Sequence, residues 1–284
     1  MAVFDLRPVV APSLPNATPD YEKQYEDQYS NVLRLYFNQL DNFTRALTAS
    51  GGGVGLSFPY FSGYQDGYTQ LTVAIPNSTS TAAISVTSTA GFPSSGYIII
   101  DQEIISYTTT TATTFDGTIT RGVFSTTKSS HAVNAYVSEA AAVTSTTSAA
   151  MRLSTVISSN QITCTVPDTK IYFTNSGIYN IQFSVQLLNY TTSDDNVTVW
   201  FRKNGSDVAN SASIEQVPPK HGSSPGAVIL ALNFMDTFVA NDYVEIYWAS
   251  TTGETVLATF PPGTSPTRPA SPGLIVTVSF VSHT

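Results

Sequence analysis

Near the start of the chain, hydrophobic residues follow the period of a coiled coil. Between Asp20 and Leu47 they recur at steps of four, three, four, three and four residues, which is the spacing of the seam between packed helices. The pattern predicts a helix over residues 20–50. We expect its seam to consist of Tyr29, Leu33, Tyr36, Leu40, Phe43 and Leu47.

This seam needs a partner, and the rest of the chain offers no matching helical pattern. The most economical partners are therefore copies of the same chain. Three seam positions are aromatic, and such large rings favour a three-stranded core over a tight two-stranded one. A helix of this length is marginal alone in water, so association would stabilise it. The alternative is that the helix covers a β domain of its own chain.

Residues 1–19 are predicted to form an extended arm. Pro8, Pro12 and Pro15 block both helix and central strand there, and Thr18 followed by Pro19 is a typical helix start. The alternatives are an arm that anchors the chain in a groove on another protein and a frayed terminus packed on its own chain. The anchoring side chains would be Phe4, Leu6, Val9, Val10 and Leu14.

Beyond the helix the hydrophobic pattern changes to period two, which predicts a mainly β chain. Residues 51–82 are rich in Gly, Tyr and Ser, and we expect an irregular connector there. Residues 83–138 alternate apolar and polar positions between turn sequences at 93–96 and 116–117, as a small β module does. Residues 139–284 contain a longer series of strands.

The strands of residues 139–284 predict layered packing. In the segment 177–189 the odd-numbered residues from Tyr179 to Leu187 are apolar and their neighbours polar, so one face belongs to the core. Asn204 with Gly205 predicts a tight hairpin turn. The segments AVILALNFM and LIVTVSFVS are nearly apolar on both faces. Such strands need cover on both sides, which implies a two-sheet sandwich or burial between subunits.

Composition narrows the possible partners. Of the 284 residues, 42% are hydrophobic and only 11% are charged, and the net charge is −8. This balance argues against a nucleic-acid partner, which would require clustered Lys and Arg. Asp5 and Arg7 interrupt the apolar N-terminal run, so we expect neither a secretory signal nor a membrane span. We expect the single cysteine, Cys164, to be a buried, unreactive thiol.

No motif predicts catalysis. The three histidines are far apart in sequence and lack the spacing of metal ligands. The loop tip Asp194, Asp195 and Asn196 could bind Ca²⁺, although such acidic tips are ordinarily solvated turns. Glycan cleavage would need two carboxylates a short distance apart, and spacing in sequence cannot place any two of the candidates at that separation. The candidates are Asp194, Asp207, Glu215, Asp236, Asp242, Glu245 and Glu254. We therefore expect no enzyme activity, no cofactor and no metal.

A family resemblance is carried by five C-terminal segments, which are SGIYNIQFSVQLLN, VWFRKNGSDVANS, VPPKHGSSPGAV, ANDYVEIYWAS and PPGTSPTRPASPGLIVTVSFV. In that order they resemble the β-rich terminal domain of bacteriophage virion proteins, especially of phages that infect aquatic bacteria and cyanobacteria. The segment IIIDQEIISYTTTTATTFDGTITRGVFSTTKSSHA is similar to a small module of phage appendage proteins, and the helix with YEDQYSNVLRLYFNQLDNF resembles their N-terminal helices. The terminal domain is also similar in layout to the trimeric jelly roll of C1q and tumour necrosis factor.

The resemblance implies a tail, neck or head fibre, or a capsid decoration protein. With the helix pattern, it leads us to expect a non-enzymatic homotrimer on the surface of the virion, attached to other virion proteins by its N-terminus and displaying a C-terminal jelly roll. Candidate host-contact residues lie in three loops and are Tyr190, Asp194, Asp195, Lys220, His221 and Arg268. The alternative is a lectin-like receptor-binding protein for host polysaccharide, which would need exposed rings such as Tyr190, Tyr247 or Trp248.

Overall fold

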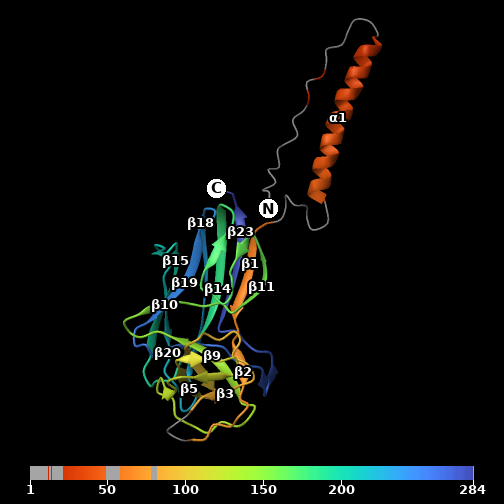
Figure 1. The fold of residues 1–284 in the computed structure, drawn as a ribbon. Helices are drawn as coiled ribbons and strands as arrows, with labels where there is room; N and C mark the ends of the chain where they lie inside the picture. Colours follow the sequence, from red (N-terminus) through yellow and green to blue (C-terminus); the bar gives the residue numbers. More distant parts are fainter. Residues whose placement is uncertain (1–11, 13, 15–21, 49–57, 78–81, 284) are drawn as a thin grey trace. The chain divides into compact units, whose positions relative to one another are not determined.

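The computed structural model describes residues 12, 14, 22–48, 58–77 and 82–283. The chain divides into two compact units, residues 1–58 and residues 59–284. The first contains helix α1 (Lys23–Thr48), and the second is built from strands (Figure 1). The mainly β chain expected from the sequence is confirmed.

Helix α1 matches the helix predicted over residues 20–50. Glu26 in its first turn and Arg45 in its last have the charges that the helix dipole favours, and Arg45 also pairs with Asp41 at 2.9 Å. On the seam, Leu40 is exposed, and Tyr29, Leu33, Tyr36 and Phe43 are half-buried. The side chain of Leu47 lies outside the described residues, so the coiled coil itself stays a prediction.

Most of the predicted anchoring arm lies outside the described residues, including Phe4, Leu6, Val9 and Val10. Leu14 is described and is exposed. Among the described residues, no helix combines the length and hydrophobicity that a membrane span requires.

The unit of residues 59–284 contains a long first sheet of antiparallel strands. Within the described residues its neighbouring strands are, in order, β11 (Thr155–Asn160), β1 (Tyr60–Gln65), β23 (Leu274–Ser282), β14 (Gly177–Asn189), β20 (Thr255–Ala258), β9 (Tyr136–Ala142), β4 (Gly96–Ile100), β5 (Glu103–Tyr107) and β8 (Thr120–Val123). Two further strands branch from it, since β18 (Gly226–Phe238) pairs with β14 and β2 (Tyr68–Gln70) pairs with β9.

A second sheet packs against part of the first. Its strands are β12 (Ile162–Thr163), β13 (Ile171–Phe173), β19 (Tyr243–Ser250), β15 (Asp195–Lys203) and β16 (Ser206–Asp207), with β10 (Ser148–Ala150) beside β19 and β17 (Ser213–Val217) beside β15. Two small sheets complete the described strands. They are β3 (Ile84–Ser85), β7 (Thr114–Asp116) and β6 (Thr109–Thr110), and the pair β21 (Gly263–Thr264) and β22 (Thr267–Arg268).

The inner faces of the two sheets form a sandwich core. The odd-numbered residues of β14 are buried as predicted, and Phe183 among them meets Phe201 of β15 with ring centroids 5.6 Å apart. Trp248 of β19 is 1% exposed and belongs to the same cluster. Each such side chain contributes roughly 1.5–3 kcal/mol on burial. The sandwich is therefore shown, and the jelly-roll connectivity stays a prediction.

The small β region of residues 83–138 has its own core but shares the first sheet. Ile98, Ile105 and Phe115 lie in one buried cluster. Strand β9 continues from this region into the sandwich, where Ala142 pairs with Val256 of β20. The boundary predicted between residues 138 and 139 thus falls inside a strand.

A buried charged network holds the small β region together. Arg121 of β8 donates to both carboxylate oxygens of Glu103 on β5, at 2.8 and 2.5 Å. The amide of Ser129 donates to Glu103 at 3.0 Å, and Nε2 of His131 lies 2.9 Å from the same carboxylate. Burial would raise the pKa of Glu103, but the bonds from Arg121, Ser129 and His131 outweigh it, so this pKa lies below its ordinary value.

The prediction of an irregular connector over residues 51–82 is wrong for part of that range, because strands β1 and β2 lie there. Phe61 of β1 is buried in the sandwich core. Gly63 of β1 permits a close approach of neighbouring groups. A Cβ at Gly63 would lie 2.8 Å from Cζ of Phe61 and 3.0 Å from the carbonyl oxygen of Thr155 on the neighbouring strand.

The predicted hairpin at Asn204 and Gly205 is confirmed. Both residues have positive φ, 51° and 80°, and Lys203 pairs with Ser206 across the turn. Asn and Gly adopt this conformation at low cost, and it matches the twist of the flanking strands.

Candidate functional site

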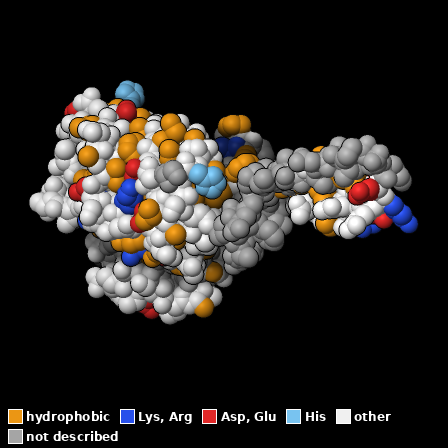
Figure 2. Space-filling model, turned by 90° about the horizontal axis from the view of Figure 1, so that it is seen from above, with side chains coloured by type: hydrophobic (Ala, Val, Ile, Leu, Met, Phe, Trp, Pro, Cys, Tyr) orange, Lys and Arg blue, Asp and Glu red, His pale blue; other side chains and the backbone are white. Residues whose placement is uncertain are grey.

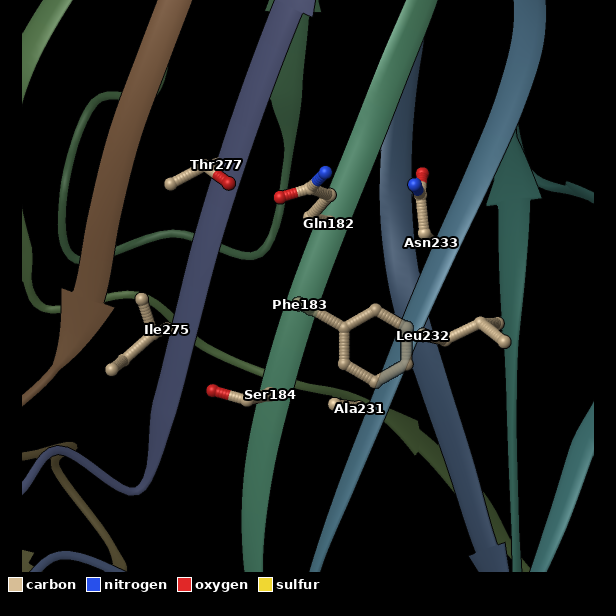
Figure 3. A pocket seen from close by; sticks show the side chains of 8 residues that line it. All are labelled: Gln182, Phe183, Ser184, Ala231, Leu232, Asn233, Ile275 and Thr277. Carbon is tan, nitrogen blue, oxygen red and sulfur yellow. The ribbon is translucent and has the colours of Figure 1, made fainter.

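The side of β23, β14 and β18 that points away from the sandwich core is exposed. The pairing register places Thr277, Gln182 and Asn233 in one row across the three strands. A shallow hollow of about 380 Å³ lies over this row and the next (Figure 3). We call this surface the uncharged face and define it by Asn180, Gln182, Ser184, Gln186, Ala227, Ile229, Ala231, Asn233, Met235, Ile275, Thr277 and Ser279.

None of these twelve side chains carries a charge. Large apolar groups are exposed among the amides and hydroxyls, with Ile229 66%, Met235 62% and Ile275 39% exposed. Figure 2 shows the same character more broadly, because charged side chains are sparse on the visible surface and hydrophobic groups are scattered among uncharged polar ones. Apolar groups surrounded by uncharged polar ones are typical of a surface that another protein covers.

Strand β18 adds an edge to the uncharged face. It pairs with β14 over its full length, from Gly226 opposite Asn189 to Phe238 opposite Gly177. Among the described strands, no pairing is recorded on its other side. Long edge strands with exposed apolar side chains tend to associate with other chains. Within residues 59–284, as far as the structure describes them, the strands predicted to need cover on both sides are covered by the second sheet on the inner side only.

Two of the predicted host-contact residues are buried. Tyr190 packs in an apolar cluster, and burial raises the pKa of its hydroxyl to about 12. Asp195 accepts hydrogen bonds from the hydroxyls of Ser250 and Thr251, at 2.6 and 2.9 Å, and from the amide of Thr252 at 3.0 Å. Burial would raise the pKa of Asp195, but these bonds keep it below its ordinary value. Both side chains stabilise the fold and are unavailable to a partner.

The other four predicted contact residues reach the surface in two places. Asp194 accepts a hydrogen bond from Gln216, and the backbone amide of Lys220 donates to the carbonyl of Thr191 at 2.8 Å, so the first two loops meet. His221 is exposed in the second of these loops. Arg268 is exposed on β22, where its guanidinium carbon lies 6.0 Å from the ring centre of Phe260.

Asp195 is not available for the Ca²⁺ site considered at residues 194–196. The oxygens of Asp195 point inward to hydroxyls and an amide. Over the described part of the chain, no group of three or more His, Cys, Asp or Glu side chains could hold a metal ion.

Of the three rings proposed for a lectin-like platform, one reaches the surface. Trp248 and Tyr190 are buried, whereas Tyr247 is partly exposed on the outer face of the second sheet. It lies opposite Trp200, whose outward position follows from the alternation in VTVWFRK. Sequence reasoning predicted that AVILALNFM and LIVTVSFVS need cover on both sides, but it did not bring them together with β14 into one uncharged face. A further local signal is the lack of charge at alternate positions of residues 227–235.

No protein-family model and no curated protein sequence matches this chain. The phage resemblance therefore remains a prediction, and function must be inferred from the surfaces themselves.

Proposed function

We propose that this protein is a non-enzymatic structural protein of a bacteriophage particle, a homotrimeric fibre or capsid decoration. Its N-terminal arm and α1 attach it to other virion proteins. Its β unit, with a jelly-roll connectivity, is displayed outward for adhesion or host contact. The uncharged face carries this proposal, because it is a broad, partly apolar surface that the described strands of the β unit leave exposed.

Sister chains fit the uncharged face for an electrostatic reason. With a net charge of −8, two copies repel each other wherever their acidic side chains come close. A face without charges avoids that repulsion. Its amides and hydroxyls include both donors and acceptors, so they can pair with the same groups of another copy. Burying Ile229 and Met235 there stabilises the contact by about 25 cal/mol per Å² of apolar surface.

Helix α1 supports the same partner independently. Leu40 on the seam and Phe37 beside it are exposed, and the seam follows the heptad period. Within a three-stranded coil these side chains would be covered by the same residues of two sister helices. Two surfaces in separate units thus call for further copies of one chain.

The segments that resemble phage virion proteins support a displayed domain. They cover β14, the hairpin of β15 and β16, the loop before β18, β19 and the loop before β23. All belong to the sandwich. Three sandwiches on one fibre would strengthen adhesion, because the second and third contacts form at a high effective concentration.

Substitution on the uncharged face tests the oligomer. Ile229→Glu places a charge on the face where we propose that sister chains meet. In sedimentation velocity experiments we expect this variant to dissociate at protein concentrations at which the wild-type trimer stays intact. Ile214→Glu is the matched control, because Ile214 is 70% exposed on β17 of the other sheet. Equal dissociation of the two variants would contradict the assignment of this face.

Location on the virion needs a separate experiment. Gold-labelled antibodies against residues 59–284 should decorate intact phage particles that carry the gene, and imaging would show whether the label lies on tail, neck or capsid. Absence of the chain from purified particles would overturn the structural role.

A further inference from the structure

Two aromatic pairs lie on the outer face of the second sheet. Trp200 of β15 is directly opposite Tyr247 of β19, with ring centroids 5.9 Å apart. Tyr172 of β13 is directly opposite Tyr243 of β19, with centroids 5.4 Å apart. Val244 and Ile246, which alternate with the outward residues of β19, point inward to the sandwich core. We call Tyr172, Tyr243, Trp200 and Tyr247 the aromatic ladder.

Charged side chains hold the ladder in place. The ammonium of Lys170 lies 4.6 Å from the ring centre of Tyr243, and the guanidinium of Arg202 lies 4.5 Å from that of Tyr247. The indole nitrogen of Trp200 donates to Asp207 at 2.8 Å, and Nε of Arg202 lies 3.1 Å from the same oxygen. The rings and their polar neighbours are therefore fixed before any ligand arrives.

A carboxylate lies between the two pairs. Glu245 is on β19 midway between Tyr243 and Tyr247, and the register places it opposite Arg202. It is buried and accepts a hydrogen bond from the hydroxyl of Thr169 at 2.5 Å. The ladder thus combines ring surfaces with two carboxylates and two cations.

We infer that the aromatic ladder binds a neutral polysaccharide, an inference that rests on the host-contact part of the proposed function. A pyranose ring presents a face of C–H groups that stacks on an aromatic ring, and a rim of hydroxyls that bonds to carboxylate and guanidinium groups. Ligand sites are usually lined by aromatic and apolar side chains together with a small number of precisely positioned polar groups. The ladder supplies both parts.

The charge balance selects the class of polysaccharide. Lys170 and Arg202 are matched by Asp207 and Glu245, so the ladder has no surplus of positive charge for an anionic chain. The distance between the two aromatic pairs sets the minimum length of a ligand that contacts both. Tyr243 and Tyr247 are four residues apart on one strand, about 13 Å, so a ligand that reaches both pairs contains several sugar units.

The test is binding of the full-length protein to a printed array of neutral and acidic oligosaccharides, followed by calorimetric titration of the best neutral oligosaccharide. We expect saturable binding to neutral glycans. Trp200→Ala and Tyr247→Ala should each weaken it about tenfold or more. Tyr68→Ala is the matched control, because Tyr68 is an exposed tyrosine on β2 whose ring meets Tyr136 at 6.1 Å, and it should bind like the wild type.

Several results would overturn the ladder assignment. They are the absence of saturable binding to any neutral glycan, a preference for acidic glycans, and equal affinity of wild type with both ladder variants. Because the two variants are independent, failure of one to fold leaves the other to decide. A trimer found on phage particles that binds no glycan would refute the ladder alone. A glycan-binding monomer absent from particles would refute the proposed function alone.

Discussion

Replacing Glu103 with Gln perturbs one buried network without changing the shape of the side chain. In the wild type the carboxylate receives two bonds from Arg121, one from the amide of Ser129 and one contact from His131. Glu103→Gln keeps the volume but removes the negative charge. The guanidinium of Arg121, which is 1% exposed, would then remain buried without its counter-charge.

The magnitude follows from that burial. Removing one partner of a buried ion pair typically costs 3–5 kcal/mol, because the remaining charge is left uncompensated. For a unit of this size each kcal/mol lowers the melting temperature by about 2–4 °C. We therefore expect Glu103→Gln to lower the melting temperature of residues 59–284 by roughly 6–20 °C at pH 7.

The stability difference between wild type and Glu103→Gln should decrease as the pH falls. The pKa of Glu103 lies below its ordinary value of 4.5 in the folded protein, because the hydrogen bonds outweigh the opposing effect of burial. Its contribution to stability is fully present above pH 4.5 and is lost as the pH falls through the lower folded pKa. The difference between wild type and Glu103→Gln should therefore be constant from pH 7 to about pH 5 and shrink below that.

Urea unfolding followed by circular dichroism at several pH values measures this difference. Glu215→Gln is the control, because Glu215 on β17 is partly exposed and makes no ion pair among the described residues. It should leave stability nearly unchanged. A loss below about 1 kcal/mol at pH 7 for Glu103→Gln, or a loss that persists undiminished in acid, would refute the reasoning.

Four other predictions test the core, the backbone and the seam. Trp248→Ala should destabilise the sandwich by about 3–5 kcal/mol in urea unfolding, because it empties a fully buried site. Gly226→Ala should cost roughly 1–3 kcal/mol or more in the same assay, since its Cβ would clash with the backbone carbonyl of Pro218. Burial raises the pKa of Cys164 to about 11, so a thiol reagent at pH 8 should label it rapidly only after unfolding. Leu40→Asp should weaken self-association in sedimentation experiments, whereas Gln39→Asp, one position off the seam, should not.

Local patterns predicted the elements that depend on local chemistry. The heptad run gave helix α1, the alternation of residues 177–189 gave β14, and Asn204 with Gly205 gave the hairpin. Strand β1 was not predicted from the sequence, because its partner strands are distant in sequence. Tyr60 pairs with Ser279 of β23 and with Asn160 of β11, and no local pattern reports such pairing.

The candidate sites show the same division. The sequence alone places Asp195 at a loop tip, because the residues whose hydroxyls bind it, Ser250 and Thr251, lie 55 and 56 positions further along the chain. Alternation alone placed Trp200 on an outward face, but only the register brings it opposite Tyr247. Surfaces that several strands build together cannot be predicted from one strand at a time.

Self-association is the central claim, and sedimentation equilibrium of the full-length chain at neutral pH measures it most directly. We predict a particle of three times the chain mass of 30.4 kDa. A folded protein that sediments as a single chain at every concentration examined would contradict the account.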